Sequence, residues 1–371
     1  TQVDATARGI EVVQGISPQI YLKNCVLRSS GYGINITGCA YSGSAAEQEY
    51  LQSMVVELDN TKIVNQIIGD YNTQTARAGQ ARGIQVYDAG AGSVLTLKKG
   101  SEINGYGYAL NFSCSQRKNN APVDSQGFVV NVIDSSIRSW GCLNIWTANT
   151  VFNISGSTLL GINTDTNRAN DFSTIAMNNG IYSADGASPP PNVFTISNTT
   201  ITNYASDEAR NNGVEQQLFR VDNQGSTKIN LTNVLFKDTT GAVKTAIVSA
   251  DTKEGNPMDD EEFAKYINEN VVGNNVSLQG ADGKQIRLGP AVAPTSLAIN
   301  RESLTLAEKN SFTLSVSSTH EYADASVEWK SENNAIATVD ATGKVSALRA
   351  GQVTIVATAK HVKEGESPAS T

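Results

Sequence analysis

One pattern recurs along the first two thirds of this chain and constrains its fold more than any other feature. Each copy reads apolar, any, apolar, any, then Asn, Gly or Asp, then a small or β-branched residue, any, apolar. Apolar residues at every second position predict a strand with one buried face. Asn, Gly and Asp best tolerate a left-handed backbone, so the fifth position predicts a corner between two short strands. The copies lie at residues 20–27, 56–63, 95–103 (with one extra residue before Gly100), 130–137, 152–159, 194–201 and 229–236.

A second, shorter pattern precedes each copy and reads small, apolar, any, apolar. It predicts a third short strand, so that three strands with corners between them make one coil of a solenoid. A single coil cannot bury its apolar face, whereas stacked coils bury a continuous core and place equivalent residues ~4.8 Å apart. The aliphatic anchors of the third strand are predicted at Ile10, Ile34, Ile84, Leu110, Leu143, Ile181, Leu218 and Ile247.

The spacing between copies varies, and the hexapeptide rule of left-handed β-helices is absent. Residues 1–290 resemble the right-handed parallel β-helix of the pectate-lyase-like superfamily, whose coils accept insertions at their corners. The resemblance implies an all-β solenoid. Enzymes and adhesins share this fold, so the fold does not decide between them.

Composition excludes several classes of partner. The net charge of −8 argues against nucleic acid and against anionic membrane surfaces. No apolar run is long enough to span a bilayer. Because Thr1 is not a natural start, we expect a segment of a longer parent chain with further domains.

The cysteines Cys25, Cys39, Cys114 and Cys142 do not have the spacing of a zinc site. They lie in or beside the repeated strands, which leaves two interpretations. They are either buried small hydrophobic residues or disulfides between neighbouring coils, Cys25 with Cys39 or Cys114 with Cys142.

From about Pro294 the pattern changes to short alternating strands separated by polar turns. The blocks VEWKS at 327–331, IATVD at 336–340, GKV at 343–345 and GQVTIVA at 351–357 occur in order. They resemble the bacterial immunoglobulin-like domain of the group 2 type, found in intimin- and invasin-like surface proteins.

This second resemblance implies an immunoglobulin-like β-sandwich over residues 291–371. Trp329 is expected to fill the space between two sheets, and Gly343 and Gly351 to lie in tight turns that need a positive φ. Such domains usually close with a final strand. We expect that strand to be lacking, because the chain ends after the polar segment 360–371.

A helix is predicted near residues 256–270, between the two domains. Asn256 and Pro257 offer an N-cap and a first-turn proline, and acidic residues follow them. Since an open solenoid end exposes core residues and strand edges, we expect this helix to cap the end of the solenoid.

Catalytic residues are sparse in this sequence. The only histidines, His320 and His361, lie in the second domain, and the motifs of polygalacturonase-like enzymes are missing. Lyases of this fold combine a calcium site of carboxylates with an Arg or Lys base. The nearest candidates are Arg168 with Asp165 and Asp171.

A column of aspartates is the one candidate metal site. Counting four residues on from the anchors gives Asp88, Asp185, Asp222 and Asp251, of which the last three belong to successive coils. Carboxylates stacked ~5 Å apart repel one another unless they are screened, hydrogen-bonded or bridged by a cation. The column predicts either turns capped by Asp or a Ca²⁺ site, and no other cofactor is indicated.

Insertions at the corners are the remaining candidates for binding, because loops on a rigid scaffold often carry function. They cover residues 40–53, 70–82, 115–126, 161–179 and 203–215. Aromatic residues near them either stack on sugar rings or pack their own loops. The candidate binding residues are Tyr41, Tyr50, Tyr71, Phe172 and Tyr204.

Two functions fit these observations. The first is a non-enzymatic, adhesin-like bacterial protein, extracellular or at the cell surface. Its β-helix would bind a glycan or a host protein, and its immunoglobulin-like domain would act as a spacer. The second is a polysaccharide lyase or glycoside hydrolase. The missing catalytic motifs favour the first.

Overall fold

The computed structural model describes residues 2–5, 7–13, 17–37, 53–65, 81–87, 89–113, 127–163, 172–178, 191–211, 216–221, 227–249, 258–318, 323–362 and 366–371. The chain forms two compact units. The first comprises Thr1–Pro257 and Asn270–Leu288, and the second comprises Met258–Glu269 and Gly289–Thr371.

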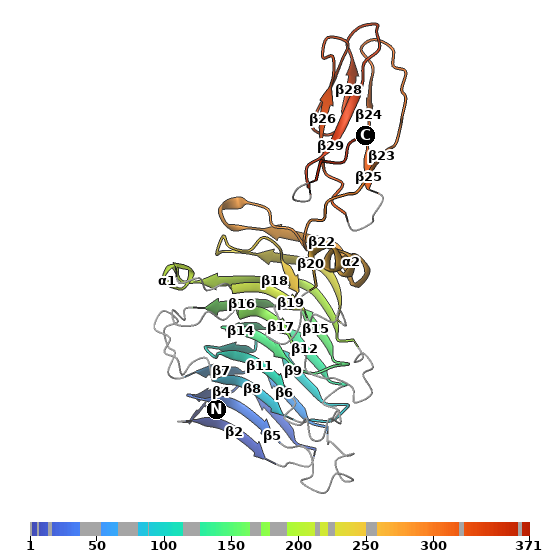
Figure 1. Cartoon of the computed structure of the whole chain (residues 1–371). Coiled ribbons are helices and arrows are strands. Elements are labelled where there is room, and N and C mark those ends of the chain that lie inside the picture. The colour runs from blue at the N-terminus through green and yellow to red at the C-terminus, as the bar shows by residue number, and fades with distance from the viewer. Residues whose placement is uncertain are drawn as a thin grey trace. The chain divides into compact units, whose positions relative to one another are not determined.

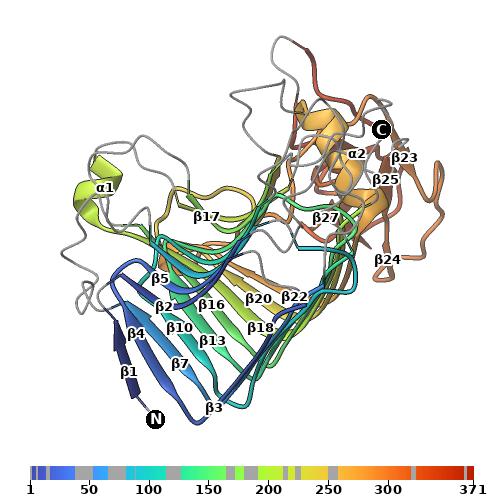
Figure 2. The same ribbon diagram turned by 90° about the horizontal axis from the view of Figure 1, so that it is seen from below.

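The first unit is a parallel β-helix, as the repeat predicts (Figures 1 and 2). Each coil contributes to a 14-stranded sheet and to an 8-stranded sheet, and all pairs between coils are parallel. In the long sheet the repeat begins with β3 (Gln19–Lys23), β6 (Val55–Asp59), β9 (Val94–Lys98), β12 (Val129–Ile133), β15 (Val151–Ser155), β18 (Val193–Ala205), β20 (Lys228–Lys237) and β22 (Val271–Gln279). After the corner come β1 (Gln2–Ala5), β4 (Val26–Ser29), β7 (Lys62–Asn65), β10 (Glu102–Asn104), β13 (Ser136–Ser139), β16 (Thr158–Asn163) and the second halves of β18, β20 and β22.

The 8-stranded sheet is formed by the third strand of each coil. Its strands are β2 (Arg8–Val13), β5 (Tyr32–Thr37), β8 (Arg82–Tyr87), β11 (Tyr108–Ser113), β14 (Gly141–Ile145), β17 (Phe172–Met177), β19 (Gln216–Val221) and β21 (Ile247–Ser249). A short helix, α1 (Asp207–Asn211), lies between β18 and β19.

The predicted corners are confirmed, because every fifth position of the repeat has a positive φ. The angles are 52° at Asn24, 49° at Asn60, 78° at Gly100, 46° at Asp134, 58° at Gly156, 47° at Asn198 and 54° at Asn233. The extra residue of the third copy, Lys99, is also left-handed, with a φ of 56°.

An eighth copy of the repeat, at residues 271–278, escapes the sequence pattern. β22 pairs with β20 in register, and its corner residue Asn275 has a φ of 54°. The pattern fails here because Gly273 stands in register with Leu231, where the other copies have an apolar residue.

Two of the predicted anchors are wrong. The observed row runs through Leu143, Ile175, Phe219 and Ile247 instead of through Ile181 and Leu218. Ile181 lies outside the described residues. The motif around Gly180 imitates the anchor pattern, but the segment Phe172–Met177 provides the strand. At β19 two apolar residues are adjacent, and Phe219 takes the register position.

Aromatic rings fill the core in the middle of the solenoid. The rings of Phe152 and Phe194 stack, with centroids 4.3 Å apart and planes 8° from parallel. Phe219 meets Phe194 edge-on at 5.0 Å, and Phe112 meets Phe152 edge-on at 6.4 Å. All four side chains are completely buried.

Hydroxyl side chains directly after the corners tie each coil to the next. The Ser157 Oγ lies 3.1 Å from the Val132 carbonyl oxygen and accepts the Ser135 N–H at 3.1 Å. Thr61, Ser101 and Thr199 make equivalent bonds in their own coils, where the repeat requires a small or β-branched residue.

Ser157→Ala is expected to lower the free energy of unfolding by about 1–3 kcal/mol, because the buried Ser135 N–H would lose its partner. Denaturant unfolding measures this loss. Ser157→Thr is the matched control: it keeps the hydroxyl that Thr199 supplies in the next coil and should cost much less. Equal stability of the alanine and threonine variants would contradict this role.

The solenoid continues past the predicted helix. α2 spans Asp260–Asn270, and the Asp259 carboxylate accepts the Glu262 N–H at 2.8 Å. Asp259 therefore acts as the N-cap, while Asn256 lies outside the described residues. The chain then forms β22 and a 3₁₀ turn at Ala281–Gly283. The Ile247 N–H donates to the Leu288 carbonyl at 2.9 Å, which adds a last rung to the 8-stranded sheet.

The second unit carries antiparallel strands, as its resemblance implies. They are β23 (Leu297–Ile299), β24 (Ser311–Thr313), β25 (Val316–Ser318), β26 (Val327–Ser331), β27 (Ala337–Val339), β28 (Lys344–Ala347) and β29 (Ile355–Ala359). Strand β23 pairs with β25, β24 and β27 flank β28, and β26 pairs with β29. Residues 369–371 also bond to β29, through Ala357 and Ala359.

Trp329 packs against the core of this unit, which is formed by Leu314, Ala337 and Val345. Gly343 has a φ of 81°, and a Cβ added there would lie 2.4 Å from the Leu314 carbonyl oxygen. A larger residue would therefore be strained in two ways, by the backbone conformation and by contact.

Candidate functional site

The predicted insertions all adjoin the 8-stranded sheet. Each lies in a connection between one of its strands and the long sheet: 40–53 follows β5, 70–82 precedes β8, 115–126 follows β11, 161–179 surrounds β17 and 203–215 precedes β19. Most of their residues lie outside the described part of the chain. A binding site formed with these insertions would involve the outward side of this sheet, which we call the outer face.

A ladder of amide side chains runs across the outer face. Asn111 donates to the Gln85 Oε1 at 2.8 Å, and Asn144 donates to Asn111. Asn178 donates to the Asn144 Oδ1 at 2.7 Å and accepts from the Arg220 guanidinium at 2.9 Å. Such ladders link stacked strands, and buried amides need these partners.

The amide ladder is a structural element of the solenoid. Gln85, Asn111 and Asn144 are only 2%, 4% and 7% exposed. Their repeated position, between two apolar residues of each third strand, explains the polar residue that the short pattern places there.

A second row lies at the start of the same strands. Tyr32 pairs with Arg82, which pairs with Tyr108. The Arg82 guanidinium lies 4.6 Å from the centre of the Tyr108 ring, and Arg8 lies 5.5 Å from that of Tyr32. These cation–π contacts further join the first coils.

The third row lies at the end of the strands, and we call it the outer column. Register pairs Val13 with Thr37 and Tyr87 with Ser113. Trp146 follows Ile145, the register partner of Phe112. Trp146 is 37% exposed and Val13 59% exposed. The members of the outer column, coil by coil, are Val13, Thr37, Tyr87, Ser113, Trp146 and Asn178.

The outer column is not among the predicted site residues, although the sequence contains its signal. Each member stands three residues after an anchor, as Tyr87 does after Ile84 and Trp146 after Leu143. Asn178 follows the same rule only from the corrected anchor Ile175.

The predicted aromatic residues are only partly within the described structure. Tyr204 is 41% exposed and pairs with Ile162 in the long sheet, so it belongs to a different sheet from Trp146. Phe172 begins β17, and its side chain is outside the description. Tyr41, Tyr50 and Tyr71 lie outside the described residues.

The predicted catalytic residues Asp165, Arg168 and Asp171 also lie outside the described residues. The catalytic interpretation therefore stays a prediction. Within the described residues there is no group of three or more His, Cys, Asp or Glu side chains that could hold a metal ion.

Two members of the predicted aspartate column were counted from anchors that the structure corrects. With Ile175 and Phe219 as anchors, the position four residues on falls at 179 and 223 instead of at Asp185 and Asp222. Asp88 keeps its offset from Ile84, and of the three successive members only Asp251 keeps its offset, from Ile247. Asp185, Asp222 and Asp251 all lie outside the described residues, so Ca²⁺ binding stays a prediction.

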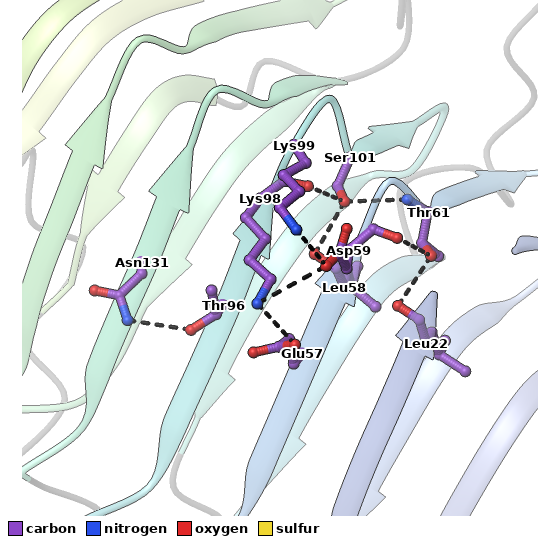
Figure 3. A network of polar contacts seen from close by, with 10 residues as sticks. All are labelled: Leu22, Glu57, Leu58, Asp59, Thr61, Thr96, Lys98, Lys99, Ser101 and Asn131. Carbon is purple, nitrogen blue, oxygen red and sulfur yellow. Dashed lines mark hydrogen bonds and ion pairs between the residues drawn. The ribbon is translucent and has the colours of Figure 1, made fainter. Parts of the chain in front are cut away.

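Charged residues on the first coils of the long sheet neutralise one another (Figure 3). Lys98 lies 2.9 Å from Glu57, and Lys99 lies 3.1 Å from Asp59. Lys99 is the extra residue of the third copy. The hydrogen bond from Lys99 lowers the pKa of Asp59, with further attraction from Lys23 and Lys98 and against the effect of burial.

Asp59→Asn should weaken the acid dependence of stability. Since the folded-state pKa of Asp59 lies below its ordinary value of 3.8, its contribution is complete above that value. The contribution is lost as the pH falls through the folded-state pKa. Thermal unfolding from about pH 5 to about pH 2.5 should therefore show a smaller decline in Tm for the variant.

Lys99→Met provides the second arm of that experiment, because it removes the partner and leaves the carboxylate. It should also flatten the acid decline. If Tm falls with pH in Asp59→Asn just as it does in the wild type, the contact between Lys99 and Asp59 does not stabilise the fold.

Two of the cysteines lie in the described structure, and both are free thiols. Cys142 is completely buried, and burial raises the pKa of its thiol well above its ordinary value. Cys25 is half-buried beside the first corner. Cys39 and Cys114 lie outside the described residues.

The geometry defines an all-β protein with a solenoid unit and a sandwich unit. Residues 293–368 match the family model of the bacterial Ig-like domain (group 2). Domains of this family occur in bacterial surface proteins such as adhesins. Searches of curated proteins and of solved structures gave no significant match. Among the described helices, none has the length and apolar character needed to cross a membrane.

Proposed function

We propose that this protein is an adhesin-like binding protein, secreted or at the bacterial surface. The β-helix presents the outer column to a glycan, and the Ig-like domain acts as a spacer. One observation carries the proposal: Trp146 is held 37% exposed on a sheet whose neighbouring polar row is committed to internal hydrogen bonds.

The chemistry of the outer column supports a sugar more than a protein partner. Tyr and Trp offer flat apolar faces with a polar edge, and such faces pack against sugar rings. Thr37 stands in the same column and supplies a hydroxyl group. A host protein as the partner is the other outcome that an array test would reveal.

Binding arrays test this proposal directly. The whole chain should bind members of a glycan array, and Trp146→Ala should lose that binding while keeping the wild-type Tm. Tyr21→Ala is the matched control, because Tyr21 is an exposed aromatic residue on β3 of the long sheet. Binding to host proteins alone would replace the glycan with a protein partner.

The enzyme hypothesis is tested on the same samples. A panel of polysaccharides with Ca²⁺ present should yield no new reducing ends and no unsaturated products. Depolymerisation combined with silent arrays would overturn the proposal and establish a lyase or hydrolase.

A further inference from the structure

The outer column alternates in character from one coil to the next. Val13, Tyr87 and Trp146 are apolar or aromatic, and the coils between them carry small polar residues. The register that sets this order is given by the pairing of β2 with β5, β5 with β8, β8 with β11 and β11 with β14. Asn178 continues the alternation, since its N–H donates to the Ile145 carbonyl at 2.9 Å.

The alternation fixes a distance. Neighbouring coils are separated by about 4.8 Å, so Tyr87 and Trp146 are about 9.6 Å apart along the solenoid axis, with Ser113 between them. That distance is close to the length of one disaccharide in an extended β-linked chain. A chain with a two-fold twist presents the same face of its sugar ring at every second residue.

Connections between strands follow the same alternation. The segments that follow the apolar positions are short, and those that follow the polar positions carry the insertions. The short segments are 14–18, 88–93 and 147–150, and the long ones are 38–54, 114–128 and 179–192.

The outer column is also uncharged. The charged groups of the neighbouring row have partners within the protein: Glu11 accepts from Asn35, and the Arg220 guanidinium donates to Asn178. The outer column therefore offers no ionic partner to the carboxylates or sulfates of an acidic polysaccharide.

We infer that the outer column binds a linear, uncharged, β-linked polysaccharide that lies along the solenoid axis, with one disaccharide for every two coils. Tyr87 and Trp146 stack on alternate sugar rings. This inference rests on the proposed glycan binding and specifies the class and direction of the ligand.

Calorimetric titration of the whole chain with neutral β-1,4-linked oligosaccharides of increasing length tests the inference. The affinity should rise in steps of one disaccharide. Trp146→Ala should lower the affinity on the order of tenfold, and Tyr87→Ala should lower it only for oligosaccharides long enough to reach both rings. Trp146→Phe should recover most of the loss, and Tyr21→Ala should change nothing.

The outcomes separate the two levels of the proposal. An even rise with each added sugar, a preference for acidic oligosaccharides, or unchanged affinity of Trp146→Ala would overturn the inference and leave glycan binding intact. Failure to bind any glycan, with binding to host proteins or turnover instead, would overturn the proposed function itself.

Discussion

Phe152→Ala is expected to lower the free energy of unfolding of the β-helix by about 3–5 kcal/mol. The Phe152 side chain is completely buried and stacks on Phe194 with ring centroids 4.3 Å apart. It also touches Phe112 edge-on. Its removal would leave a cavity between three coils, and strands held by parallel pairing on both sides cannot close that cavity. Calorimetry can resolve the transition of the β-helix from that of the Ig-like domain.

Val151→Ala is the matched control for this experiment. Val151 precedes Phe152 on β15 but points outward and is 37% exposed. Its truncation should change stability by no more than about 0.5 kcal/mol. Similar losses in both variants would show that Phe152 is not part of a close-packed core.

Gly83→Ala is expected to destabilise the β-helix by about 1–3 kcal/mol or to prevent its folding. A Cβ at this position would lie 2.5 Å from the Ala109 carbonyl oxygen and 2.5 Å from the Ile103 Cγ2. The Ala109 oxygen belongs to the backbone of the next coil, so it can yield only if the two coils separate. Denaturant midpoints and hydrogen exchange in β8 and β11 would measure the effect.

Gly100→Ala separates this contact from ordinary glycine effects. Gly100 has a φ of 78°, and a Cβ there would meet nothing within 4 Å. Its cost is therefore conformational and about 1–2 kcal/mol, confined to one corner. If Gly83→Ala is tolerated as well as Gly100→Ala, the close approach of neighbouring coils at β8 is refuted.

The repeat predicts the solenoid well because its chemistry is local. An Asn, Gly or Asp between alternating apolar residues needs only its own neighbours to form a corner, and Asn60 and Gly156 show this directly. The prediction fails where chemistry is ambiguous. Gly273 breaks the apolar pattern of the last copy, and Gly180 resembles the start of a strand that forms at Phe172 instead.

The candidate site is harder to predict because it depends on pairing between coils. Trp146 follows a strand directly, and its offset of three residues from Leu143 does not by itself show which side chains lie beside it. Its alignment with Tyr87 emerges only when β8, β11 and β14 are brought into register across insertions of unequal length. The sequence analysis selected aromatic residues in or near the insertions as binding candidates. The exposed Trp146 instead lies directly after strand β14.

The outer column carries apolar or aromatic residues and small polar residues on alternate coils. This order also limits how such a protein can change its length by gene duplication. Copying a single coil would preserve the core, the corners and the hydroxyl bonds, because each coil meets only its neighbours. It would nevertheless place two rings, or two small polar residues, on adjacent coils. Copying a pair of coils, such as those of β11 and β14, would keep the order of Ser113 and Trp146 intact. Lineages that retain the ligand are therefore expected to gain and lose coils in even numbers.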